Sequence, residues 1–358
     1  MSPADELTAA PPYSLGKTEK HALYGEALSR LTRYHAERCP EYRQIVRALG
    51  YEEGASLSAE EVPMLPVRLF KEYDLRSVGT ESVAKTMTSS GTTGQRTSKI
   101  YLDKENTARQ TKVMAHIVGD FLGEKRLPMI ILDTSAVLKD RKMFSARGAG
   151  ILGFSVFGRD RIYALDEKMR LDPDGLRAFL EKHGGERIFL FGFTFMIWQY
   201  FYKELRRLGQ TLDLSNGVLI HGGGWKKLRQ EAVSADDFRA ALREVCGIER
   251  VHNYYGMVEQ LGSICMECGH GHLHCSNYSD VLVRDPRDFS VLPVGGRGLI
   301  EVQSLLPTSY PGHVLLTEDE GAILGEDDCP CGRKGKYFTI FGRIKGAELR
   351  GCSDTYGR

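Results

Sequence analysis

A short polar segment between residues 88 and 99 has the composition of a phosphate-binding loop. The sequence Thr88-Ser-Ser-Gly-Thr-Thr-Gly94 places five hydroxyl groups and two glycines within seven residues, and Lys99 follows close behind. Glycines let the backbone approach a ligand closely, and hydroxyls with free N–H groups suit phosphate oxygens. Lys99 can bring a positive charge to a terminal phosphate. The segment is not a Walker loop, because Arg96 stands where that motif has a glycine. We favour phosphate binding over a flexible polar surface loop.

Cysteines and histidines form two groups whose spacing is typical of a metal site. Three cysteines and three histidines occur between residues 265 and 275, namely Cys265, Cys268, His270, His272, His274 and Cys275, and Cys329-Pro-Cys331 follows. Thiolate and imidazole ligands in this pattern suit tetrahedral zinc. We expect a structural Zn²⁺ bound by Cys268, His274, Cys329 and Cys331. Cys265 is an alternative ligand, His270 and His272 are further candidates, and free buried cysteines or a redox Cys-x-x-Cys remain other interpretations.

The segment His221-Gly-Gly-Gly-Trp225 is similar to the oxyanion-hole segment of lipase-like esterases. Such an enzyme also needs a serine in a Gly-x-Ser-x-Gly turn. The nearest candidate, Ser155 in Gly153-Phe-Ser-Val-Phe-Gly158, has the wrong spacing. We therefore reject an esterase.

The elements that would position these residues alternate between strands and helices in the middle of the chain. Short apolar runs predict buried strands at 128–132, 187–191, 217–221 and 250–254. Helical spacing predicts helices at 174–183, 195–208 and 234–246, and two more between residues 19 and 49 that Pro40 separates. This alternation favours an α/β domain with a largely parallel sheet.

Short β-like runs replace this alternation after residue 262, at 281–283, 299–305, 314–317 and 337–341. We therefore expect four regions. Residues 1–16 form a disordered leader, and residues 17–264 form an α/β core. Residues 265–345 form a β-rich subdomain with the zinc site, and residues 346–358 form a mobile C-terminal tail.

Composition excludes several classes of function for these 358 residues. The net charge is only +1, from 48 Lys and Arg against 47 Asp and Glu, which argues against a general nucleic-acid or membrane-surface binder. No run of about 18 apolar residues predicts a membrane span, and the N-terminus does not have the pattern of a signal peptide. We expect a cytoplasmic protein with free or metal-bound thiols.

Five motifs, taken in chain order, resemble those of the adenylate-forming enzymes. The polar loop at 88–99 resembles their phosphate loop. The other four are His221-Gly-Gly-Gly224, Asn253-Tyr-Tyr-Gly-Met-Val-Glu259, Thr317-Glu-Asp319-Glu-Gly and Phe341-Gly-Arg343-Ile-Lys345-Gly. Within that superfamily the chain is most similar to the acyl-protein synthetases of bacterial luminescence, near the phenylacetate-CoA ligases. The sequence segments that show this similarity are Pro66-Val-Arg-Leu-Phe-Lys71, Ser304-Leu-Leu-Pro307, Tyr310-Pro-Gly-His313 and Glu348-Leu-Arg-Gly-Cys352-Ser-Asp.

The resemblance implies a reaction and assigns residues to it. A carboxylate attacks the α-phosphate of ATP, pyrophosphate leaves, and an acyl-adenylate remains. The residues implied to cradle the β- and γ-phosphates are Thr88, Ser89, Ser90, Gly91, Thr92, Thr93 and Gly94. Glu259 binds Mg²⁺, with a loop hydroxyl such as that of Thr92. The base pocket is implied to contain Tyr255 and Gly256, with Gly222, Gly223 and Gly224 as one wall. Asp319 is implied to bind the ribose. Arg343 is implied to lie near the ribose and the α-phosphate.

The resemblance also implies an acceptor for the acyl group. The fold it implies is the N-terminal domain of an adenylate-forming enzyme with a small β-rich subdomain. The usual full C-terminal domain is not expected, because the sequence ends 15 residues after Arg343. Cys352 matches the acyl-accepting cysteine of acyl-protein synthetases. A reductase-type or acyl-carrier protein is the expected partner, and a carboxylic acid, a fatty acid in our preferred interpretation, is the substrate.

Two other functions stay open: a CoA ligase for an aryl or short acid, and a non-catalytic adenylate-binding scaffold of a reductase complex. Residues 190–198 and 221–225 are expected to wall the acid pocket, and their aromatic side chains suit an acyl chain or an aryl ring.

Overall fold

A computed structural model of the chain describes residues 3–89, 96–139, 146–225 and 231–344. The chain divides into two compact units, and the first is built from two separate stretches of sequence. Unit 1 comprises Met1–Asp120 and Gly256–Glu348, and unit 2 is centred on Phe121–Tyr255. This division differs from the expected boundaries at residues 17, 265 and 346, because residues 17–120 group with the late strands rather than with the middle of the chain.

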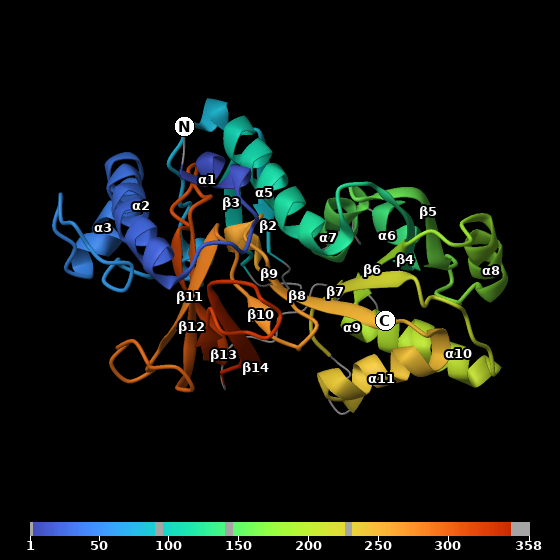
Figure 1. The fold of residues 1–358 in the computed structure, drawn as a ribbon. Helices are drawn as coiled ribbons and strands as arrows, with labels where there is room; N and C mark the ends of the chain where they lie inside the picture. The colour runs from blue at the N-terminus through green and yellow to red at the C-terminus, as the bar shows by residue number, and fades with distance from the viewer. Residues whose placement is uncertain (1–2, 90–95, 140–145, 226–230, 345–358) are drawn as a thin grey trace. The chain divides into compact units, whose positions relative to one another are not determined.

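Unit 2 contains a parallel sheet with the order β5-β4-β6-β7-β8 (Figure 1). Its strands are β4 (Leu127–Thr134), β5 (Gly158–Leu165), β6 (Ile188–Phe193), β7 (Gly217–Gly222) and β8 (Arg250–Tyr255). The predicted α/β class and parallel sheet are confirmed. The order reverses at β4, whose two neighbours are β5 and β6, and in open α/β sheets ligands bind outside the carboxyl ends of strands at such a point.

The helices of unit 2 begin and end where local signals place them. They are α6 (Ala136–Lys139), α7 (Ala146–Ser155), α8 (Pro173–Lys182), α9 (Thr194–Met196), the π-helix η3 (Ile197–Tyr202), α10 (Lys203–Leu208) and α11 (Ala235–Cys246). Ser234 caps α11 by accepting a hydrogen bond from the Asp237 N–H, and Gly247 ends it in a left-handed conformation. The helix predicted at 195–208 is present but divided by the π-helical turn.

The core of unit 2 is apolar. Leu190 and Leu219 lie on neighbouring strands and are 1% exposed, and they belong to one buried cluster with residues of η3 and α11 such as Trp198 and Leu242. Every residue of β6 and of β7 is buried. This explains why continuous apolar runs predicted these strands, since parallel strands are covered on both faces.

Unit 1 combines helices from the first third of the chain with an antiparallel sheet from the last (Figure 1). The helices are α1 (Pro3–Glu6), η1 (Leu7–Ala9), α2 (Lys17–Arg38), α3 (Pro40–Ala48), α4 (Leu69–Glu72), η2 (Thr80–Ser82) and α5 (Lys104–Leu122), followed late in the chain by η5 (Val258–Gln260). The break predicted at Pro40 is confirmed, since α2 ends at Arg38 and α3 begins at Pro40.

The strands of unit 1 follow the order β11-β12-β13-β14-β10-β9. They are β9 (Cys265–Glu267), β10 (Leu273–His274), β11 (Ser279–Arg284), β12 (Arg297–Ser304), β13 (Val314–Glu326) and β14 (Lys336–Arg343). The short strand β1 (Leu65–Pro66) pairs in parallel with β13, and β2 (Lys85–Thr88) with β3 (Lys99–Leu102) forms a separate hairpin. The β-like runs predicted after residue 262 lie in β11, β12, β13 and β14, except that Leu305 follows the end of β12.

The first 16 residues, expected to be a disordered leader, have a defined place in unit 1 from residue 3 onward. Asn277 holds them: its Nδ2 donates to the Pro11 carbonyl at 2.8 Å, and its Oδ1 accepts from the Leu15 N–H at 3.0 Å. The Asn277 N–H also donates to the Pro12 carbonyl at 2.7 Å. No local signal predicts these contacts, because Asn277 and its partners are about 260 residues apart.

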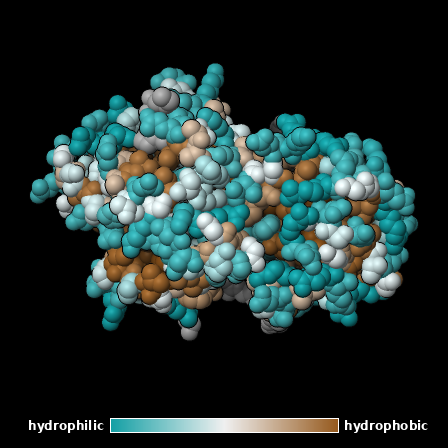
Figure 2. Space-filling view, in the orientation of Figure 1, coloured by the Kyte–Doolittle hydropathy of each residue, from teal (hydrophilic) through white to brown (hydrophobic). Residues whose placement is uncertain are grey.

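The face drawn in Figure 2 is mostly hydrophilic and carries separate patches of hydrophobic residues. Among the described residues, none of the helices combines the length and apolar character needed to cross a membrane.

Candidate functional site

The hairpin β2–β3 carries both ends of the predicted phosphate loop. Thr88 pairs across the strands with Lys99, the Ser89 N–H donates to the Ser98 carbonyl at 3.1 Å, and the Ser98 N–H donates to Ser89 Oγ at 2.9 Å. These bonds bring the two ends of the loop together, as close contact with a phosphate requires. The other predicted loop residues, Ser90, Gly91, Thr92, Thr93 and Gly94, lie outside the described residues.

Lys99 is half exposed and faces a carboxylate. Its Nζ lies 3.6 Å from Asp74 Oδ1, and the side chain is 53% exposed. The Tyr101 hydroxyl, two residues along the same strand, donates to that oxygen at 2.7 Å and lowers the pKa of Asp74. An exposed pair of this kind is weak, so the Lys99 ammonium can exchange Asp74 for a phosphate at little cost.

Glu259 lies in η5 and is 3% exposed. The next residue fixes this turn: Gln260 Nε2 donates to the Gly312 carbonyl at 2.9 Å and to the Val302 carbonyl at 3.1 Å. A buried carboxylate on a fixed turn is a hard oxygen ligand of the kind that Mg²⁺ takes.

The structure brings Asp319 and Arg343 together. They are partners across the β13–β14 pair, and Arg343 Nε lies 3.7 Å from Asp319 Oδ1. Arg343 Nη1 also lies 3.8 Å from Glu318 Oε2. The two residues predicted to contact the ribose and α-phosphate therefore lie side by side, Arg343 at the end of β14 and Asp319 in the middle of β13.

The residues predicted for the adenine side lie in unit 2. Gly222 ends β7, and a side chain there would collide with the Tyr254 ring. Gly223 has a φ of 74°, in the left-handed region that favours glycine. Thr194 Oγ1 donates to the Gly223 carbonyl at 2.8 Å and lies 2.9 Å from His221 Nδ1. This turn is thus held rigidly at the carboxyl end of the parallel sheet.

Aromatic side chains from 190–198 and 221–225 contact one another and Phe238 within unit 2. The ring centroids of Trp198 and Trp225 are 5.3 Å apart, and those of His221 and Phe238 are 4.9 Å apart. Burial lowers the pKa of His221 to about 3, so its ring is neutral.

The predicted nucleotide residues come from both units. Tyr255 ends β8, and Tyr255, Gly222, Gly223 and Gly224 belong to unit 2. Lys99, Gly256, Glu259, Asp319 and Arg343 belong to unit 1. Cys352 lies outside the described residues.

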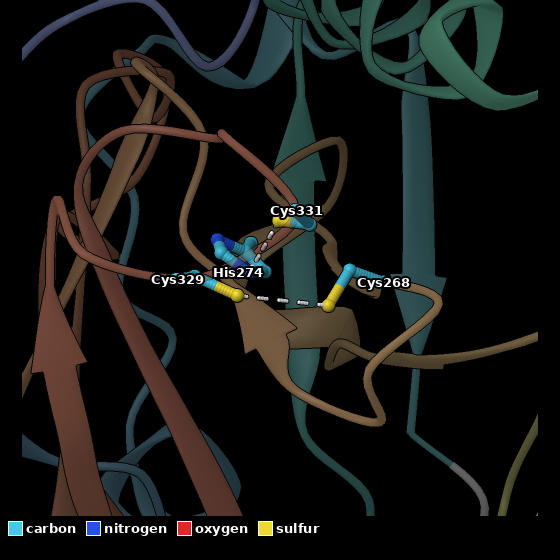
Figure 3. Close-up of side chains that lie close together, drawn as sticks. All are labelled: Cys268, His274, Cys329 and Cys331. Carbon is cyan, nitrogen blue, oxygen red and sulfur yellow. Dashed lines mark hydrogen bonds between the residues drawn. The ribbon is translucent and has the colours of Figure 1, made fainter.

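The four predicted zinc ligands lie together in unit 1, with their side chains pointing toward one another (Figure 3). The ligand atoms of Cys268, His274, Cys329 and Cys331 all lie within 4.8 Å of one another. Cys268 Sγ lies 4.0 Å from Cys329 Sγ, and Cys331 Sγ lies 3.4 Å from His274 Nε2.

The alternative ligands have other neighbours. Cys265 lies on β9 beside the buried thiol of Cys275, whose pKa is raised by burial and then by Cys265. His272 stacks on the Tyr337 ring at 4.9 Å, and its Nδ1 lies 3.4 Å from Cys329 Sγ. The His270 backbone N–H donates to Cys268 Sγ at 3.4 Å.

Sequence reasoning missed the residues that surround this cluster. Arg333 lowers the pKa of Cys331, against the effect of burial, through its backbone N–H and its side chain. Arg333 is itself held by Asp120, with 3.1 Å between Arg333 Nε and Asp120 Oδ2, and it lies over the Tyr13 ring at 5.2 Å. The position of Arg333 two residues after Cys331 was the one signal available.

A buried ion pair in unit 2 was also missed. Asp133, near the end of β4, accepts from Arg147 Nη2 at 2.9 Å, and the two residues are 0% and 2% exposed. Only the fold reveals that they meet.

The chain is similar to known proteins over nearly its whole length. The family model described as acyl-protein synthetase, LuxE, matches residues 2–358. The chain is 23% identical over 357 residues to the long-chain-fatty-acid–luciferin-component ligase of Vibrio harveyi, with 98% of this chain and 91% of the relative covered. It is 22% identical over 331 residues to the ligase of the same description from Aliivibrio fischeri, with 89% and 84% covered.

Two more distant likenesses point to related ligases. The phenylacetate-coenzyme A ligase of Thermus thermophilus is 34% identical over 114 residues, which is 30% of this chain and 24% of that protein. The crystal structure of an open conformation of 2-hydroxyisobutyryl-CoA ligase superposes with a TM-score of 0.73 at 18% identity, with 93% of this chain and 77% of that chain covered. This likeness shows that the two chains share a fold.

Proposed function

The chain belongs to the acyl-protein synthetase family and is therefore a ligase, and we propose that it activates a long-chain fatty acid as an acyl-adenylate and passes the acyl group to a thiol. The observation that carries this proposal is the family match over residues 2–358, together with the placement of Glu259, Asp319 and Arg343 in one unit. The similar ligases of Vibrio harveyi and Aliivibrio fischeri support the choice of a long-chain acid.

Adenylation depends on positioning and on neutralising phosphate charge more than on proton transfer. We assign Thr88, Ser89 and the residues up to Gly94 to the β- and γ-phosphates, with the Lys99 ammonium reaching a terminal phosphate. Asp319 accepts the ribose hydroxyls, and the neighbouring Arg343 guanidinium approaches the α-phosphate where charge develops. Tyr255 and the Gly222–Gly224 turn of unit 2 contact the base.

The residues fit a magnesium ion bound with ATP. Glu259 is the residue that would hold it, because its carboxylate is buried on a turn that Gln260 fixes. Magnesium bound there would neutralise negative charge on the phosphates. The Gln260 hydrogen bonds fix the turn from which the Glu259 side chain projects.

The acyl acceptor in this proposal is a thiol. Cys352 is the first candidate, by its match to the family's tail, and a reductase-type or carrier-protein thiol is the second. A thioester forms when the sulfur attacks the acyl carbonyl carbon and AMP leaves with the bonding electron pair. The thiol proton passes to solvent or to a base at that step.

We also propose that Cys268, His274, Cys329 and Cys331 bind a structural Zn²⁺. Zn–S bonds of about 2.3 Å in a tetrahedron place two sulfurs about 3.8 Å apart, and Cys268 and Cys329 are 4.0 Å apart. Burial lowers the pKa of His274 to about 4, which keeps its ring neutral, as a metal ligand must be. Four protein ligands leave no open position, so this metal would stabilise the sheet and take no part in the chemistry.

A CoA ligase is the second candidate, favoured by the 34% identity to a phenylacetate-coenzyme A ligase over 114 residues. The two functions share the adenylation step and differ in acid and acceptor.

ATP–pyrophosphate exchange with Mg²⁺ tests the proposal, with saturated C4 to C18 acids, benzoate and phenylacetate as substrates. Exchange confined to long chains, followed by a thioester that Cys352→Ser abolishes without loss of exchange, is the expected result. Exchange with aryl acids alone would favour the CoA ligase. Binding of ATP without exchange for any acid would contradict both.

A further inference from the structure

The glycine turn at the end of β7 has an exposed backbone on a buried support. Gly223 and Gly224 are exposed, whereas Thr194 and His221, which lie against the turn, are each 6% exposed. The φ of Gly223 is 74°, so the turn has a conformation that residues with a side chain rarely adopt. Buried side chains thus hold a backbone whose N–H and C=O groups are open to a ligand.

The Thr194 hydroxyl contacts three groups at the end of β7. Thr194 begins α9, directly after β6. Its Oγ1 lies 2.8 Å from the Gly223 carbonyl oxygen and 3.3 Å from the Gly222 carbonyl oxygen. It also lies 2.9 Å from His221 Nδ1. A hydroxyl has one proton to donate, and the shorter of the two carbonyl distances assigns that proton to Gly223.

This assignment also fixes the tautomer of His221. Burial lowers the pKa of His221 to about 3, so its ring is neutral and carries one N–H. Because Thr194 donates to Gly223, its oxygen accepts from His221, and the N–H is on Nδ1. One hydroxyl therefore joins the end of β6, the end of β7 and the turn. A valine in its place would leave the His221 N–H buried without an acceptor.

Ring contacts hold the other end of the turn. Trp225 follows Gly224, and its ring lies edge-on to the rings of Trp198 and Phe238, with 5.3 and 6.1 Å between centroids. Trp198 is 8% exposed and lies in the π-helix η3, four residues after Thr194. Such π-helical turns are rare and are frequently found at functional sites. The segment 194–198 therefore contacts the turn at both of its ends.

We propose that Thr194 is a positioning residue for the base of ATP: its hydroxyl holds the turn 222–224 in the shape that contacts the adenine. The inference rests on the proposed function, which assigns this turn to the base. Thr194 acts through the backbone of Gly223 and not through contact with the nucleotide. A turn that is ordered before the ligand arrives loses less conformational entropy on binding, and this raises the affinity.

The first experiment compares Thr194→Val with Thr32→Val. Thr32 is a matched control in unit 1: it is 0% exposed, and its Oγ1 donates to the Leu28 carbonyl at 2.9 Å and lies 2.9 Å from His313 Nε2. Each substitution removes a hydroxyl between a buried histidine and a backbone carbonyl and nearly keeps the volume. The readouts are the Kd for ATP by isothermal titration calorimetry, the KM values for ATP and pyrophosphate in the exchange reaction, and Tm.

Both variants should lower Tm, because each leaves a buried histidine without a partner. Only Thr194→Val should raise the Kd and the KM for ATP, by about fivefold, as for the loss of one neutral hydrogen bond. Its KM for pyrophosphate should not change, since pyrophosphate has no base. Thr194→Ser keeps the hydroxyl and should bind ATP as the wild type does.

A second variant tests the turn without altering Thr194. Gly223→Ala places a side chain at a φ of 74°, which strains the turn. It should therefore also raise the Kd for ATP and leave the KM for pyrophosphate unchanged.

Three results would overturn the inference while the exchange reaction of the wild type stands. They are a wild-type Kd for ATP in Thr194→Val or in Gly223→Ala, an equal rise in Thr32→Val, and an equal rise in the KM for pyrophosphate. ATP binding by the wild type without exchange for any acid contradicts the proposed function alone, and the Kd values then still decide the role of Thr194. If the wild type binds no ATP, the proposed function and the inference both fail.

Discussion

The two units bury different amounts of charge. The buried cluster of unit 2 consists of Leu190, Leu219 and other apolar or aromatic side chains of a parallel sheet and its helices, and this unit also buries the ion pair of Asp133 with Arg147. Unit 1 buries more charge: Asp280 lies 2.8 Å from Lys336 Nζ and 3.5 Å from Lys20 Nζ, and Arg284 donates to Glu301 at 2.7 Å. Unit 2 is thus held mainly by packing, whereas unit 1 adds several buried polar contacts to its packing.

This difference follows from how each unit is assembled from the sequence. Unit 2 is centred on one continuous stretch, in which β4, β5, β6 and β7 are each followed by at least one helix. Unit 1 joins two stretches separated by unit 2, and long-range bonds such as that of Gln303 Nε2 to the Ala59 carbonyl, at 2.7 Å, hold the stretches in register. Directional polar bonds specify such a register more sharply than apolar contact does.

The largest expected effect concerns the Cys/His cluster of unit 1. Cys331→Ala should abolish stoichiometric zinc binding and lower the free energy of unfolding by several kcal/mol, because a structural metal contributes its binding energy to folding. Metal analysis by mass spectrometry and thermal unfolding check both. Cys246→Ala removes a buried thiol of unit 2 and should leave the zinc content unchanged. Full zinc occupancy in Cys331→Ala would contradict the assignment.

The packing of unit 2 gives the next prediction. Leu190→Ala should lower the free energy of unfolding by about 2–5 kcal/mol, since it leaves a cavity in the centre of the sheet. Leu190 is 1% exposed. Urea unfolding measures the loss, and zinc content should not change. A loss of zinc in this variant would mean that the two units do not respond separately.

How much the sequence predicts also differs between the units. The strands β4, β6, β7 and β8 were predicted because each is a buried apolar run, but β5, whose sequence Gly-Arg-Asp-Arg-Ile-Tyr-Ala-Leu begins with charged residues, was not. In unit 1 the Cys/His quartet was predicted from residue type and spacing alone. Thiols and imidazoles can be recognised as metal ligands from their residue type and spacing, and the structure does place these four side chains together.

Contacts between distant parts of unit 1 were beyond sequence reasoning. Nothing in residues 3–16 indicates that Asn277 holds them. An asparagine is common in any context, so its partner is set by the fold. The same holds for Arg333, whose approach to Cys331 depends on the turn after that cysteine.

A smaller effect is expected on the chemistry of unit 1. Glu259→Gln keeps the volume and removes the charge, so adenylation should fall by about 10²–10³-fold, as for the loss of one preorganised charge-stabilising group. ATP–pyrophosphate exchange measures the fall, and an unchanged Tm shows that the fold is intact. Lys99→Ala removes an exposed group at the loop and should raise the KM for ATP. Exchange at the wild-type rate in Glu259→Gln would show that Glu259 has no role in adenylation.

The smallest expected effect is a pH dependence of the free energy of unfolding that arises from two buried histidines of unit 1. Burial lowers the pKa of His35 to about 3 and also lowers that of His313, whose ring stacks on His35 with 5.0 Å between centroids. The unfolded chain binds protons at these residues near pH 6.5, so their contribution to stability is complete above that pH and is lost as pH falls toward 3. At pH 5, His35 alone accounts for about 2 kcal/mol.

Urea unfolding of the wild type and of His35→Gln at pH 7 and pH 5 isolates this term. The drop in the free energy of unfolding between the two pH values should be about 2 kcal/mol smaller in the variant, whatever its stability at pH 7. Zinc-site protonation affects both proteins equally and cancels in the difference. His221→Gln in unit 2 should give a similar decrement, because burial lowers the pKa of His221 to about 3 as well. An equal drop in the wild type and in His35→Gln would mean that the pKa of His35 is the same in the folded and the unfolded protein, and would contradict the prediction.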